Sequence, residues 1–104
     1  VILKFGDIAP FSWIMQSEQQ HANVLIRQAE KYGVAIPEVP ALPDVSNLNT
    51  IEEACAAGVA AENADADLYD ELNKVTTHTD LLRVYTNLQS ASLNNHLPAF
   101  EACN

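Results

Sequence analysis

Residues 17–21 read Ser-Glu-Gln-Gln-His, which places a carboxylate and an imidazole three positions apart within a helical pattern. Residues three or four apart share one face of a helix, so Glu18 and His21 project to the same side. That side carries a stripe with alternating spacings of four and three, which runs through Ile14, Glu18, His21, Leu25, Gln28 and Tyr32. We therefore predict a helix over 10–32 in which Glu18 and His21 face the interior of a bundle and can reach one ion.

A second helix is predicted over 50–75, because Thr50 and Glu53 form a capping box at its start. Its stripe has the same alternating spacing and runs through Ile51, Cys55, Gly58, Glu62, Asp65, Tyr69 and Leu72. Glu62 and Asp65 interrupt an otherwise apolar or small face. Both carboxylates are therefore candidates for the same interior site.

A third helix is predicted over 79–102, with Thr77 and Asp80 as a second cap. Its inward stripe runs through Leu82, Tyr85, Gln89, Ser92, His96 and Ala99. Pro98 is expected to kink or loosen the end of this helix, because it frees the carbonyl of Asn94.

The connections predict how these helices are arranged. Pro37, Pro40 and Pro43 favour an extended crossover over 34–49, whereas the short joint at 76–80 favours antiparallel neighbours on either side. The apolar residues before Gly6 resemble the last turns of a helix, so 1–6 is expected to be the end of a first helix whose start is missing. The expected fold is an all-α four-helix bundle that occupies 1–104 as one domain.

Composition supports this class and excludes others. The chain has 104 residues, 48% of them hydrophobic and only 3 of them glycine, which is typical of one helix-rich globular domain. Its formal charge of −9, with five scattered basic residues, argues against nucleic acid and favours cations. No apolar run reaches the length of a transmembrane helix, so no membrane span is expected.

The candidate metal ligands are expected to meet at one level of the bundle. Glu62 lies about 15 residues before the short joint and His96 about 17 after it, which corresponds to nearly equal heights at about 1.5 Å per residue. We predict Glu18, His21, Glu62 and His96 as ligands, and Asp65 as a ligand, a hydrogen-bond acceptor for a histidine, or a partner of Tyr85 or Asn95. These donors suit iron, manganese or zinc, and no organic cofactor is expected.

A core without metal is the alternative. In that case the polar groups hydrogen-bond one another, and the bundle is a non-enzymatic interaction or storage module. A small hydrolase that uses His and Asp is disfavoured, because no nucleophile motif accompanies these residues. The sequence assigns no catalytic residue.

Five stretches together resemble a known family: Ser17 to His21, Tyr32-Gly33, Gly58 with Glu62 and Asp65, Arg83 to Leu88, and Ser-Leu-Asn-Asn-His-Leu-Pro-Ala-Phe at 92–100. The chain is similar, over essentially its whole length, to an uncharacterised ferritin-like family of bacteria and archaea that carries S-E-x-x-H and N-H-L-x-A-F motifs. The resemblance implies a ferritin-like four-helix bundle. Relatives of that fold often hold two iron or manganese ions between Glu and Glu-x-x-His residues, which implies redox or oxidase chemistry.

Two departures from the family pattern alter this expectation. The Glu-rich first helix of the family has no counterpart here, and Leu93 stands where a di-iron protein has the Glu three residues before the histidine. A single-ion or empty site is therefore favoured over a full di-iron centre. A separate N-terminal fragment or a second copy of the chain is the expected partner that completes the bundle.

Cys55 and Cys103 lie about 21 residues before and about 24 after the short joint, so an antiparallel hairpin brings them to the same end of the bundle. A disulfide would indicate an extracytoplasmic protein. The alternative is a buried Cys55 and a free thiol near the terminus, in a cytoplasmic protein.

Overall fold

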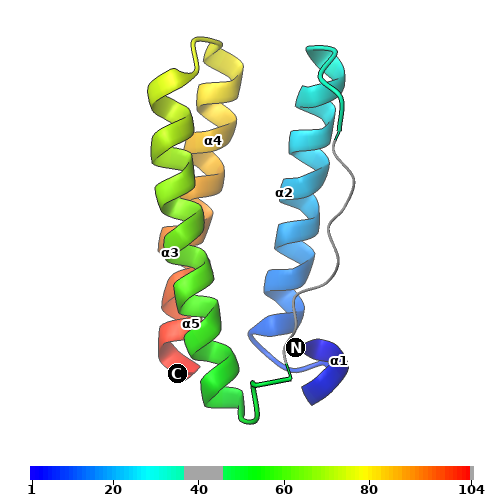
Figure 1. Ribbon diagram of the computed structural model, residues 1–104, viewed down its shortest axis with the longest axis vertical. Coiled ribbons are helices and arrows are strands. Elements are labelled where there is room, and N and C mark those ends of the chain that lie inside the picture. Colours follow the sequence, from blue (N-terminus) through cyan, green and yellow to red (C-terminus); the bar gives the residue numbers. More distant parts are fainter. Residues whose placement is uncertain (37–45, 104) are drawn as a thin grey trace.

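The computed structural model describes residues 1–36 and 46–103, and every regular element among them is helical, as the all-α prediction requires. The elements are α1 (Ile2–Phe5), α2 (Phe11–Lys31), α3 (Ile51–Val75), α4 (Thr79–Ala91), the π-helical turn η1 (Ser92–His96) and α5 (Leu97–Cys103). Three long helical segments stand side by side: α2, α3, and the continuous rod of α4, η1 and α5 (Figure 1). α3 runs antiparallel to this rod and packs along it.

The ends of α2 and α3 follow from local chemistry. Thr50 Oγ1 accepts a hydrogen bond from the backbone N–H of Glu53 at 3.1 Å, as predicted, while the Glu53 carboxylate accepts from the N–H of Asn49 at 3.3 Å. Gly33 has φ of 66°, and the N–H of Val34 returns to the carbonyl of Ala29, which closes the end of α2.

The start of α4 differs from the predicted cap. α4 begins after His78 without a side-chain cap. Asp80 binds α2 instead: its carboxylate accepts from Lys31 Nζ and from the Tyr32 hydroxyl, each at 2.6 Å. These two charge-assisted bonds hold the pKa of Asp80 well below its usual range. The end of α2 is thus attached to the joint between α3 and α4.

The predicted crossover is described only at its two ends, where residues 34–36 and 46–50 are not helical. Pro37, Pro40 and Pro43 lie outside the described residues. Within the described part of the chain, no helix combines the length and the apolar character that crossing a bilayer requires.

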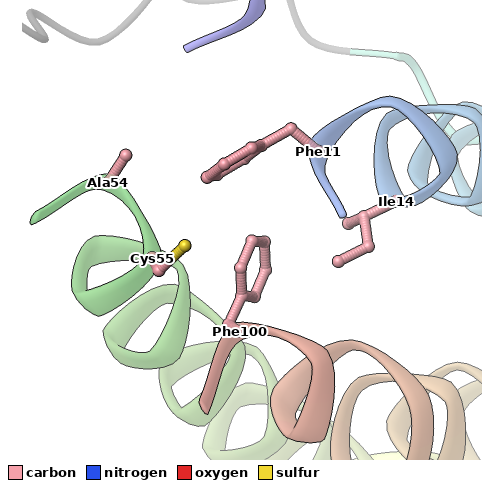
Figure 2. Packing of buried hydrophobic residues seen from close by; sticks show 5 residues of the cluster. All are labelled: Phe11, Ile14, Ala54, Cys55 and Phe100. Atoms are coloured by element: carbon pink, nitrogen blue, oxygen red, sulfur yellow. The ribbon is translucent and has the colours of Figure 1, made fainter. Parts of the chain in front are cut away.

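The apolar core lies at the end of the molecule where α2, α3 and α5 meet. Figure 2 shows its buried members, Phe11, Ile14, Ala54, Cys55 and Phe100. The rings of Phe11 and Phe100 lie 5.7 Å apart at a tilt of 49°, which joins α2 to α5. Cys55 and Cys103 form a disulfide that joins α3 to α5, so the alternative of two separate thiols is wrong.

The third predicted helix is not a continuous α-helix. At η1 the N–H of Leu97 bonds to the carbonyl of Ser92, five residues back. One extra residue is accommodated there, directly before Pro98, which has no N–H to continue the α-helical ladder. The expected disturbance near Pro98 is therefore a π turn upstream of it.

We predict that Gly58→Ala destabilises the fold, although alanine is the better helix former. A Cβ atom at Gly58 would lie 2.6 Å from the Phe100 ring, so α3 and α5 would have to move apart. Urea unfolding should show a loss of about 1–3 kcal/mol. Ala57→Gly, at an exposed position of α3, measures the intrinsic difference between the two residues. Stability equal to or above that of the unaltered protein would contradict this close packing.

Candidate metal centre

Three helical elements bring one acidic or imidazole group each to a common point. Glu18 comes from α2, Glu62 from α3 and His96 from η1, and one potential ligand atom of each lies within 4.8 Å of the others. His96 Nδ1 is 2.9 Å from Glu18 Oε1 and 3.2 Å from Glu62 Oε1. Glu62 and His96 are 3% and 1% exposed, whereas Glu18 lies at the rim.

The π turn explains how His96 reaches this point. The buried residues of the rod are Leu88, Ser92, His96 and Phe100, at successive spacings of four. In a regular α-helix each such step rotates the side chain by about 40° beyond a full turn, so Phe100 would be about 120° away from Leu88. η1 takes up one extra residue, which offsets most of this rotation. Leu88 and Phe100 can therefore face the interior on the same side of the rod.

His21 lies next to the cluster but outside the group of three atoms. Its Nδ1 is 3.5 Å from Glu18 Oε2, and its ring stacks on that of His96 with centroids 5.6 Å apart. It is thus a neighbour of the convergent donors on the α2 side.

Asp65 is half-buried and does not join the group either. Burial raises its pKa, and the charge of Glu18 adds to this effect. Within the described residues it makes no hydrogen bond to Tyr85 or Asn95, the partners considered from the sequence. Its contribution to the cluster is negative charge.

The sequence reasoning missed Ser17. Its hydroxyl lies 3.0 Å from His96 Nε2 and 3.4 Å from His21 Nε2, on the ring edges opposite the Nδ1 atoms. The signal available in the sequence was its spacing of four from His21. The indole of Trp13 meets the His96 ring edge-on at 5.9 Å, so the histidine is also packed on its apolar side.

The cluster carries more negative charge than its hydrogen bonds compensate. Burial raises the pKa of Glu62 from 4.5 to about 7; the charges of Glu18 and Asp65 act in the same direction, and the Ser92 hydroxyl opposes them. Glu62 Oε2 and Glu18 Oε1 are buried without a hydrogen bond of good geometry from the described residues. Burial and the same carboxylates raise the pKa of Tyr69 to about 12. A proton or a cation would relieve this excess.

The chemistry of the donor set fits a divalent ion of intermediate hardness. Two carboxylate oxygens and one imidazole nitrogen suit iron, manganese or zinc. Three protein ligands also leave coordination positions open for water or a substrate.

A separate hollow of about 240 Å³ lies farther along α2, toward α4. Its lining is largely apolar and consists of Leu25, Gln28, Ala29, Tyr32, Val34, Leu81 and Tyr85. It includes none of the clustered acids or imidazoles, so it is distinct from the candidate centre.

No protein-family model, curated protein or solved structure matches the chain. The ferritin-like resemblance therefore stays a prediction, and the candidate centre depends on its own geometry.

We predict that, with a chelator present, stability falls as the pH rises from 4.5 to about 7, because the folded state raises the pKa of Glu62 over this window. The protonated carboxyl is the form that the fold prefers, so the contribution is complete below pH 4.5 and lost above about pH 7. The shift corresponds to at most about 3 kcal/mol. Urea unfolding of Glu62→Gln should lack this component.

The matched control is Glu101→Gln, which alters an exposed carboxylate of α5. Its pH profile should follow that of the unaltered protein. Parallel profiles of stability against pH for Glu62→Gln and the unaltered protein would contradict the raised pKa of buried Glu62.

Proposed function

We propose that the protein binds one divalent metal ion through Glu18, Glu62 and His96. The observation that supports this proposal is the convergence of their donor atoms within 4.8 Å around buried Glu62, whose Oε2 has no hydrogen-bond partner among the described residues. Burying uncompensated carboxylates costs several kcal/mol per ion, and a divalent cation offsets that cost directly. His96 would bind through Nδ1, the nitrogen that faces both acids.

His21 and Asp65 are the additional ligands of this proposal. His21 Nδ1 already faces the second oxygen of Glu18 at 3.5 Å, so a small side-chain movement would bring it to an ion held by Glu18. Asp65 would follow only after a larger movement. Bound iron or manganese would supply redox chemistry toward oxygen or peroxide, and the open coordination positions would admit it.

The ferritin-like bundle belongs to the same proposal. The described residues hold three long helical segments, so a four-helix bundle needs one more helix, from a second copy or a separate N-terminal fragment. Large apolar side chains on α2 and α3 remain exposed, among them Trp13 at 43%, Met15 at 56% and Leu68 at 55%. Their burial would favour such an assembly.

An extracytoplasmic location is also proposed. The Cys55–Cys103 disulfide persists in an oxidising compartment and is rare where thiols are kept reduced.

The second candidate is a non-enzymatic bundle with a hydrogen-bonded polar core and no metal. It is favoured by the direct contacts of His96, which meets Glu62 at 3.2 Å and Ser17 at 3.0 Å. A proton on Glu62 would then supply the missing compensation.

Metal titration of chelator-treated protein separates the two candidates. We expect about one equivalent of Fe(II), Mn(II) or Zn(II) to bind and to raise the melting temperature, since an ion at 100 times its Kd adds about 2.7 kcal/mol. Glu18→Gln and Glu62→Gln should abolish both effects, because each removes an anionic ligand.

Asp67→Asn is the control, since it removes an exposed carboxylate of the same helix as Glu62. Less than about a tenth of an equivalent bound, with unchanged melting, would refute the metal site and favour the polar core.

A further inference from the structure

Ser17 and Glu18 hold the two histidine rings from opposite edges. The Ser17 hydroxyl faces both Nε2 atoms, at 3.0 Å for His96 and 3.4 Å for His21. The Glu18 carboxylate faces both Nδ1 atoms, at 2.9 Å and 3.5 Å. The rings are nearly parallel, with an angle of 22° between their planes. Two adjacent residues of α2 therefore define which nitrogen of each ring is turned toward the acids.

We infer that Ser17 is the positioning residue of the metal centre: it accepts a hydrogen bond from Nε2–H of both histidines and so leaves both Nδ1 atoms free to bind the ion. This inference rests on the proposed metal site. A hydroxyl oxygen has two lone pairs, so it can accept both bonds at once. A histidine ligand needs its second nitrogen fixed in this way, because the hydrogen bond there selects the tautomer and orients the ring.

A hydroxyl also serves the metal-free state. With no ion, the neutral tautomer of His96 that carries its proton on Nδ1 can donate to a carboxylate 2.9 Å or 3.2 Å away and leaves Nε2 as an acceptor. Ser17 then donates its O–H to Nε2. When the ion binds at Nδ1, the ring keeps one proton but carries it on Nε2, and Ser17 becomes the acceptor. Only a group that both donates and accepts satisfies the two states.

The same contacts invite comparison with a hydrolytic triad, since Ser17, His96 and Glu62 follow in the order of nucleophile, base and orienting acid. Two features favour the positioning role. Ser17 lies within α2, where the backbone N–H groups are taken up by the helix and cannot form an oxyanion hole. Its hydroxyl is also shared with a second imidazole, which a nucleophile does not need.

The test compares Ser17→Ala and Ser17→Thr with the unaltered protein, and uses Zn(II) as the probe. We expect Ser17→Ala to weaken Zn(II) binding by about 10- to 100-fold, which is the usual effect of losing a partner of a metal-bound histidine. Ser17→Thr keeps the hydroxyl and should restore most of the affinity. Ser12→Ala is the matched control, because this hydroxyl of α2 donates to the carbonyl of Ile8 and, within the described residues, hydrogen-bonds neither histidine.

Nitrogen-15 NMR of the histidine rings reports which nitrogen carries the proton. This signal would not change if Ser17 only stabilised the fold. The Zn(II)-loaded protein should show His96 bound through Nδ1 with its proton on Nε2, and Ser17→Ala should lose this single tautomer while its helix content is unchanged. Binding of Zn(II) through Nε2, or full affinity in Ser17→Ala, would overturn the inference and leave the metal site standing. No Zn(II) binding in the unaltered protein would overturn both. Labelling of Ser17 by a fluorophosphonate would make it a nucleophile and also overturn the inference.

Discussion

The arrangement depends on two carboxylates that face a single imidazole nitrogen in the interior of a helical assembly. His96 Nδ1 can donate one proton, yet Glu18 and Glu62 both lie within 3.2 Å of it. Hydrogen bonding to this one nitrogen cannot satisfy both acids. Burial raises the pKa of Glu62 to about 7, and the charge of Glu18 adds to this effect. The neutral alternative needs a shared proton, and the charged alternative needs a cation. The metal-bound and metal-free forms of the site differ in which of these two compensations they use.

The apolar end of the molecule makes this unfavourable cluster possible. The contact of Phe11 with Phe100 and the disulfide between Cys55 and Cys103 hold α2, α3 and α5 together one to two turns from the site. At the other end, Asp80 attaches α2 to α4. The acids and imidazoles lie between these two attachments, which oppose separation of the helices around buried Glu62 and His96. The stabilising contacts at the two ends of the helices thus offset the unfavourable burial of charge between them.

The sequence predicted the helices better than it predicted the site. The capping box at Thr50 and the stop at Gly33 are local signals, and α3 and α2 begin or end beside them. The π turn was not predicted: the expected stripe ran through Gln89 and Ala99, and only burial in the structure shows that Leu88 and Phe100 share the inward face with Ser92 and His96. The partners of Asp80 lie 48 and 49 residues away in the chain and had no such local signal. Ser17 was missed because it lies beside the inward stripe and contacts His96 only once the segments pack.

The π turn also changes which way the side chain at position 93 points relative to His96. In a regular helix, a residue three positions before His96 shares its face, so an acid there would be a second ligand from the same segment. Through η1 the turn is wider, and Leu93 is 40% exposed while His96 is buried. An acid at position 93 would therefore point toward solvent rather than toward Glu18 and Glu62. The backbone at η1 thus presents the histidine alone from this segment. This geometry by itself favours one ion over two.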